Sequence, residues 1–140
     1  MDDRFNLQRF LTAQDPVFET VRSELREGRK RTHWMWFIFP QINGLGRSPT
    51  SKYFAISSKE EAQAYLGHPI LGPRLRESTR LVERIEGCTI GEIFGSPDDL
   101  KFKSSMTLFA AATPDNRIFV DALRKYFAGE KDEATLSRLK

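Results

Sequence analysis

Residues 96–112, SPDDLKFKSSMTLFAAA, decide the fold class of this chain. Ser96 and Pro97 are typical of a helix N-cap and a first helical position, and the two aspartates that follow oppose the positive end of a helix dipole. The first turns are polar, whereas residues 106–112 are apolar on every face. Because a helix that is apolar all round is buried, the segment predicts a central helix with others packed around it.

Signals for helix starts and stops recur on both sides of this segment. Ser58 with Glu61, and Thr89 with Glu92, match the capping box, in which a hydroxyl and a carboxylate each accept a free backbone N–H. Glycine follows most of the resulting segments, and apolar residues recur inside them at helical spacing. The chain is therefore predicted to be all-α, a compact single domain of about seven short helices with one long loop at residues 41–57.

Composition agrees with one domain over residues 1–140. Of the 140 residues, 39% are hydrophobic and 29% are charged, and the net charge is +3. No stretch has the roughly 20 apolar residues needed to cross a bilayer, and the start has no signal-peptide pattern. The only cysteine, Cys88, fits a reducing compartment. We therefore expect a cytoplasmic protein that does not associate with membranes.

Four phrases of the sequence carry a family resemblance. They are HWMWFIFPQINGLGRS (33–48), YLGHPILGPRL (65–75), FGSPDDLKFKSSMTLFAA (94–111) and YFAGEKDEATLSRL (126–139). In this order they resemble the signatures of DUF1810, a bacterial family known only as a domain of unknown function. The resemblance spans nearly the whole chain and implies an all-helical fold of about seven helices, without implying an activity.

Two other names are connected with this resemblance, calpastatin and the NADAR-type domains. Some DUF1810 proteins carry the name calpastatin, which does not fit here because that inhibitor is a long disordered chain and this composition is that of a compact domain. A remoter likeness in layout is to NADAR-type domains, which are linked to ADP-ribose and N-glycosidic chemistry. Likeness of layout alone supports only an analogy.

Asp98, Lys101 and Ser105 share one stripe of the predicted central helix. A carboxylate, an ammonium and a hydroxyl that lead into an apolar helix can bind a phosphate or a sugar, or position a proton donor. Asp98 and Lys101 are therefore the candidate catalytic pair, and Ser105 is a candidate ligand contact. The alternative is a pair of exposed ion pairs, with the serine hydroxyls bonded to backbone carbonyls.

The aromatic run that precedes the long loop supplies a second candidate set: His33, Trp34, Trp36 and Gln41. Tryptophans beside a histidine suit a slot in which a nucleobase or a nicotinamide stacks. The alternative is that both tryptophans belong to the core, since large aromatic residues dominate protein cores. We expect the run to form a short buried helix.

The loop itself contributes Arg47, Lys52 and Tyr53 as candidate contacts to an anionic ligand. The phrase at 44–48, GLGRS, lacks the spacing and the lysine of a P-loop, and no strand–GxGxxG–helix context is present. Two histidines and one cysteine leave no CxxC or HExxH motif. We therefore expect neither a cofactor nor a metal site.

His68 and Arg74 lie at a predicted junction between helices, where they suit an anionic group. The alternative for His68 is a cap at the end of the preceding helix, because the dipole stabilises a histidine there.

These candidates lead to three hypotheses. The first is a domain that binds, and in an enzymatic version processes, a nucleotide-like or ADP-ribose-like small molecule; whether it is an enzyme is left open. The second is a non-catalytic protein-interaction module with an exposed aromatic and basic surface. The third is nucleic-acid binding through basic clusters within 26–31 and 74–84. It ranks last because no nucleic-acid motif accompanies the charge.

Overall fold

The computed structural model describes residues 3–139 and contains ten helices in that range, which confirms the all-α prediction. The six longer helices are α1 (Gln8–Gln14), α2 (Phe18–Glu27), α5 (Lys59–Gly67), α6 (Leu71–Arg84), α8 (Asp98–Ala112) and α9 (Arg117–Phe127). The four shorter helices are α3 (Met35–Ile38), α4 (Pro49–Tyr53), α7 (Ile90–Phe94) and α10 (Glu133–Arg138). No helix within 3–139 is both long and apolar enough to span a membrane.

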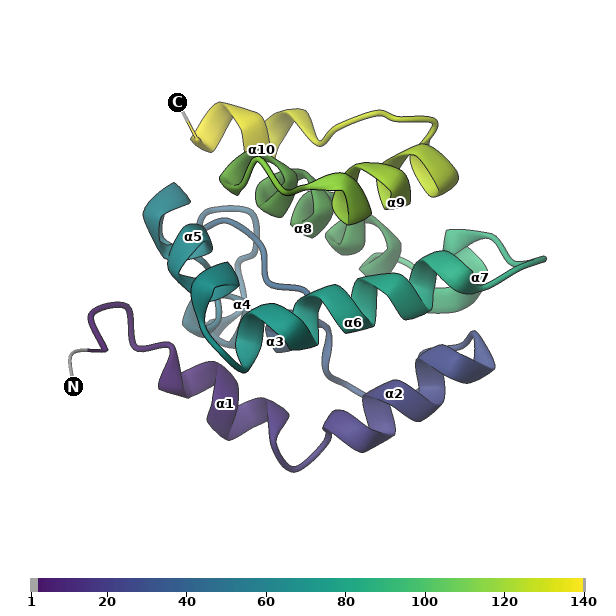
Figure 1. The fold of residues 1–140 in the computed structure, drawn as a ribbon, viewed down its shortest axis with the longest axis horizontal. Coiled ribbons are helices and arrows are strands. Elements are labelled where there is room, and N and C mark those ends of the chain that lie inside the picture. The colour runs from purple at the N-terminus through teal and green to yellow at the C-terminus, as the bar shows by residue number, and fades with distance from the viewer. Residues whose placement is uncertain (1–2, 140) are drawn as a thin grey trace.

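Helix α8 lies at the centre of the molecule and packs against α5, α7, α9 and α10 (Figure 1). From Met106 to Ala112 every side chain is buried except that of Ala111, which is half-buried. The predicted central helix is therefore confirmed. Its start differs from the prediction, because the helix begins at Asp98 and no side chain caps it.

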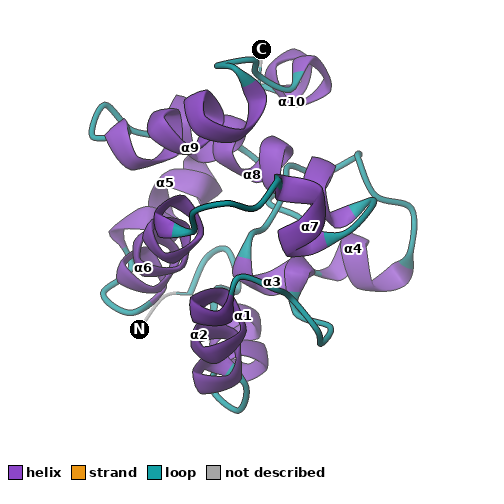
Figure 2. Ribbon diagram, turned by 90° about the vertical axis from the view of Figure 1, so that its right-hand side faces the viewer, coloured by secondary structure: helices purple, strands orange, loops and turns teal. Residues whose placement is uncertain are grey.

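The remaining helices lie on different sides of α8. In Figure 1, α1 and α2 follow one edge, α6 crosses the middle, and α9 and α10 follow the opposite edge. Figure 2 shows α3, α4 and α7 grouped on the side away from α5 and α6. The largest fully buried side chains between them are aromatic: Phe10, Trp34, Phe39, Tyr65, Phe102, Phe109 and Phe119.

The segment at 41–57, predicted as a long loop, is more ordered than expected. It contains α4, which Ser48 caps by accepting a hydrogen bond from the Ser51 N–H. A parallel β-bridge also joins Ile42 to Ile56 and draws the two ends of the segment together. The backbone of this segment is thereby fixed at both ends and at its middle.

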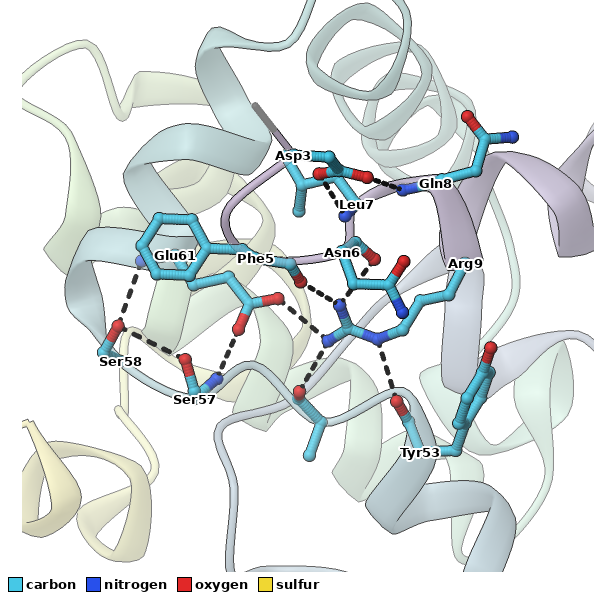
Figure 3. A network of polar contacts seen from close by, with 11 residues as sticks. Asp3, Phe5, Asn6, Leu7, Gln8, Arg9, Tyr53, Ser57, Ser58 and Glu61 are labelled. Atoms are coloured by element: carbon cyan, nitrogen blue, oxygen red, sulfur yellow. Dashed lines mark hydrogen bonds and ion pairs between the residues drawn. The ribbon is translucent and has the colours of Figure 1, made fainter. Parts of the chain in front are cut away.

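Arg9 of α1 anchors the same segment from outside (Figure 3). Its guanidinium donates to the carbonyl of Tyr53 at 2.8 Å, to that of Ala55 at 2.9 Å and to the Glu61 carboxylate at 2.8 Å. Only 8% of the Arg9 side chain and 3% of the Glu61 side chain are exposed. One buried ion pair therefore joins α1, the end of α4 and the start of α5.

The two capping boxes turn out differently. Thr89 and Glu92 form both bonds, 3.1 Å from the Glu92 N–H to the hydroxyl and 2.8 Å from the Thr89 N–H to the carboxylate. Ser58 accepts from the Glu61 N–H at 3.1 Å, but the Glu61 carboxylate accepts from the Ser57 N–H instead of the Ser58 N–H. The Ser58–Glu61 box is therefore only half formed, because one oxygen of the Glu61 carboxylate accepts from the Ser57 N–H and the other accepts from Arg9.

We expect Ser58→Ala to lower the free energy of unfolding by about 0.5–2 kcal/mol, since it removes the N-cap acceptor of α5. Urea denaturation measures the change. Ser57→Ala is the matched control, because the exposed Ser57 takes part through its backbone N–H, which the substitution keeps. That variant is expected to stay within about 0.5 kcal/mol of the parent. Equal costs for both would show that the hydroxyl of Ser58 does not cap the helix.

Candidate functional site

An open cleft of about 470 Å³ lies between the first turns of α8, the 41–57 segment and the start of α10. This volume falls within the range of about 300–1,000 Å³ that small-molecule sites occupy. Its apolar lining comes from Trp36, Leu45, Pro97, Leu100 and Ala134, and its polar lining comes from Gln41, Arg47, Ser48, Ser51, Lys101, Ser104 and Asp132, with Gly46 between them.

Lys101 stands at one side of the cleft and is held there by two contacts. Its ammonium lies 3.2 Å from a carboxylate oxygen of Asp98 and 5.1 Å from the centre of the Trp36 ring. The other oxygen of Asp98 lies 3.0 Å from the ammonium of Lys30, whose side chain is 8% exposed. Because one carboxylate is shared between two lysines, a net positive charge is left at this side of the cleft.

Trp36, Gln41 and Arg47 reach the cleft from the chain that runs out of α3. The Gln41 carbonyl accepts from the Ile56 N–H at 2.8 Å, which fixes the backbone where the chain enters the cleft wall. Within residues 3–139, no hydrogen bond engages the Gln41 amide or the Arg47 guanidinium. Both groups are therefore free to bind a ligand.

Of the two neighbouring serines on α8, Ser104 lines the cleft and Ser105 does not. The hydroxyl of Ser104 bonds the Leu100 carbonyl at 3.2 Å and an Asp132 carboxylate oxygen at 3.1 Å. Ser105 is fully buried, and its hydroxyl has no hydrogen-bond partner within residues 3–139. The stripe that begins at Lys101 thus continues into the cleft through Ser104, three residues on, and Ser105 turns towards the core.

Trp34 lies in the core with 1% of its surface exposed, and His33 is exposed and lies outside the cleft. The indole N–H of Trp34 donates to Glu24 at 2.9 Å. Burial opposes ionisation of Glu24, but the hydrogen bonds from Arg31, Thr32 and Trp34 together prevail and hold the pKa of this carboxyl below its ordinary value. Trp34 is therefore a core residue, as the alternative interpretation expected, and it does not offer a ring face to a ligand.

Lys52 and Tyr53 lie beside the cleft without lining it. Lys52 borders a smaller adjoining hollow, which it shares with Trp36 and Gln41. Tyr53 is among the most exposed large hydrophobic residues, and its backbone carbonyl is held by Arg9.

His68 and Arg74 are used elsewhere in the fold. The Nδ1 atom of His68 accepts from the N–H groups of Ile70 at 3.1 Å and Leu71 at 3.2 Å. His68 is the C-cap residue of α5, as the alternative expected, and its backbone N–H donates to the Tyr65 carbonyl at 3.2 Å. Its side chain in addition caps the start of α6. Arg74 pairs with Asp15 at 2.8 Å, and its guanidinium lies over the ring of Phe18.

The polar cleft residues that the sequence did not single out as ligand contacts are Ser48, Ser51, Ser104 and Asp132. Asp132 comes directly before α10 and caps it, as its residue type predicts. The capping role explains Asp132 locally, so nothing in the sequence indicated that this side chain also lies beside α8. Within residues 3–139 no group of three His, Cys, Asp or Glu side chains is placed to hold a metal ion.

Comparison with known proteins agrees with the resemblance drawn from the four phrases. The model of a family described as "Protein of unknown function (DUF1810)" matches residues 4–139. The crystal structure of the conserved hypothetical protein Rv1873 from Mycobacterium tuberculosis is 58% identical in sequence, with a TM-score of 0.97 over 98% of each chain. No curated protein matches the sequence significantly.

Proposed function

This chain belongs to the DUF1810 family, a family of unknown function, and we propose that its cleft binds a small anionic ligand that carries a flat ring, of the nucleotide-like class. One observation carries the proposal. Four residues chosen from the sequence for ligand-binding chemistry line this one cleft, three from the stretch that runs out of α3 and one from the distant helix α8: Trp36, Gln41, Arg47 and Lys101.

The chemistry of these side chains suits such a ligand. The Trp36 indole offers an aromatic face for a flat ring, and stacking of this kind contributes about 1–3 kcal/mol per base. Arg47 offers a planar guanidinium that binds phosphate through two parallel hydrogen bonds, and Lys101 adds a compact positive charge. Of the candidate catalytic pair, Lys101 lines the cleft, whereas Asp98 is engaged by two ammonium groups beside it.

The charge distribution favours this proposal over nucleic-acid binding. In the cluster at 26–31, Lys30 pairs with Asp98 and Arg31 pairs with Glu27. In the cluster at 74–84, Arg74 and Arg76 each pair with an aspartate. Much of the basic charge is thus neutralised within the fold, and less of it is left to contact a phosphate backbone.

The exposed apolar surface also gives little support to a protein-interaction module. Within residues 3–139, the exposed large hydrophobic side chains are those of Tyr53, Ile70 and Leu100. They come from α4, the turn before α6 and the first turns of α8. Single apolar side chains of this kind are ordinary on a monomeric protein, whereas an interface needs a contiguous patch.

The proposal predicts a ligand-dependent rise in melting temperature that depends on the cleft cations. We expect a member of a panel of nucleotides, ADP-ribose and sugar phosphates to stabilise the protein, by about 2.7 kcal/mol at a hundredfold excess over its dissociation constant. Arg47→Ala and Lys101→Ala are each expected to weaken this binding about tenfold to a hundredfold, the usual value of a hydrogen bond to a charged group. Scanning calorimetry on the three proteins measures both effects.

Arg117→Ala is the matched control, because Arg117 is an exposed arginine on α9 that lies outside the cleft. It is expected to respond to the ligand as the parent does. Lys101→Ala is expected to cost at most about 1 kcal/mol of stability, since its ion pair is partly exposed. If no compound of the panel stabilises the parent, or if Lys101→Ala and Arg47→Ala both respond fully, the proposed function is wrong.

A further inference from the structure

The carboxylate of Asp132 uses its two oxygens unequally. One oxygen, Oδ2, accepts from the Ser104 hydroxyl at 3.1 Å, from the Thr135 N–H at 3.1 Å and from the Thr135 hydroxyl. The backbone N–H of Asp132 donates to the Thr107 hydroxyl at 2.9 Å. Within residues 3–139, the other oxygen, Oδ1, accepts no hydrogen bond, and no Lys or Arg pairs with this carboxylate.

The free oxygen belongs to the cleft. Asp132 is half-buried and lines the cleft together with Ser104. The three bonds hold Oδ2 towards α8 and the first turn of α10, so Oδ1 is the oxygen left for the cleft. Because Asp132 is held through its other oxygen and its backbone N–H, this oxygen offers a positioned acceptor for a donor on the ligand.

The cleft therefore combines an acceptor with cations. Ser104, which holds Asp132, follows Lys101 by three residues on the same helix, a rise of about 4.5 Å along the axis. A simple anion would meet the cations but be repelled by the carboxylate, and an ammonium ligand would be repelled by Arg47 and Lys101. A ligand that satisfies both sides carries an anionic group and, a few ångströms away, hydrogen-bond donors such as the hydroxyls of a sugar.

We propose that Asp132 accepts hydrogen bonds from the vicinal hydroxyls of a ribose, and that the ligand of the cleft is a ribonucleotide. The phosphate lies at Arg47 and Lys101, the ring of the base lies at Trp36, and the 2′- and 3′-hydroxyls lie at Oδ1 of Asp132. Carboxylates bind ribose hydroxyls in this way in dinucleotide-binding proteins. This inference rests on the proposed function and narrows its ligand class.

Asp132→Asn tests the contact while keeping the local structure. Asparagine caps helices as well as aspartate does, so its amide oxygen replaces Oδ2 on the Thr135 N–H and its NH₂ group, a donor, takes the place of Oδ1. The probes are the four ribonucleoside 5′-monophosphates and their 2′,3′-dideoxy counterparts, with affinities measured by titration calorimetry. Asp115→Asn, an exposed aspartate outside the cleft, is the control.

For the parent protein and the control, we expect at least one ribonucleotide to bind about tenfold to a hundredfold more tightly than its dideoxy counterpart. Asp132→Asn is expected to bind the two forms equally, with an affinity for the dideoxy form no lower than that of the parent, because the substitution removes a negative charge from the cleft. Equal binding of both forms by the parent overturns this inference alone, as does a preference that survives in Asp132→Asn. Failure of all eight nucleotides to bind overturns it together with the nucleotide-like class of the proposed function.

Discussion

Replacing Glu61 with alanine is expected to lower the free energy of unfolding by about 3–5 kcal/mol. The pair that it forms with Arg9 is almost fully buried, and the carboxylate also accepts from the Ser57 N–H. Removal of the carboxylate leaves the Arg9 guanidinium in a largely buried site with backbone carbonyls as acceptors but no negative charge to compensate its own. That penalty, rather than the attraction within the pair, accounts for most of the expected loss.

Chemical denaturation of the parent, Glu61→Ala, Arg9→Met and the double variant measures the effect. Because the double variant removes both charges, we expect its cost to be smaller than the sum of the two single costs by about 0.5–3 kcal/mol, the usual range for residues in contact. A loss below about 1 kcal/mol for Glu61→Ala would place the pair among solvent-screened surface ion pairs and would contradict its burial.

Phe102→Ala is expected to cost a similar amount, about 3–5 kcal/mol, because it opens a cavity at the centre of the fold. The ring of Phe102 is fully buried. It lies 5.1 Å from the ring of Phe94 in α7 and 5.0 Å from that of Phe39 after α3, with Phe127 of α9 at 6.4 Å. Phe102 of α8 therefore packs against three other parts of the chain.

Phe102→Leu is the matched variant, since leucine refills much of the space and restores part of the packing. Its loss in denaturant melts is expected to be clearly smaller than that of the alanine variant. Leu100→Ala, two residues away in α8 but exposed, is expected to stay within about 0.5 kcal/mol of the parent. An alanine variant at 102 that costs no more than Leu100→Ala would mean that Phe102 does not lie at the core.

The long helices were predictable from the sequence, and so were the short helices α3, α7 and α10, whereas α4 was not. Residues 106–112 are apolar on all faces, and such a segment has no stable position except the centre of the molecule. Helix α3, with four residues, is too short to show a periodic pattern, and its aromatic run instead indicated a short buried helix. In α4 a local signal was present, because Ser48 and Pro49 are a cap and a first helical residue. The glycines around it favoured the prediction of a loop.

The candidate site was partly predictable for the same physical reasons. Trp34 and Trp36 are two residues apart, so they point to opposite sides of a helical turn, and composition alone does not distinguish the buried ring from the one at the cleft. Ser104 and Asp132 are 28 residues apart and meet only because α10 packs on α8. Local spacing carries no information about such a contact, which arises from the tertiary packing.

The Arg9 anchor also determines how ordered the cleft is before a ligand arrives. Arg9 holds the carbonyls of Tyr53 and Ala55, directly after the α4 turn whose Ser48 and Ser51 line the cleft. Fixing the backbone of a free loop costs about 1–2 kcal/mol per residue in conformational entropy. The α4 side of the cleft is already fixed when the chain folds. Binding of a ligand there would not incur this entropic cost again, which is what preorganisation means. For the ligand proposed above, a side chain of the first helix, outside the cleft, would thus contribute to affinity by lowering the entropic cost of binding.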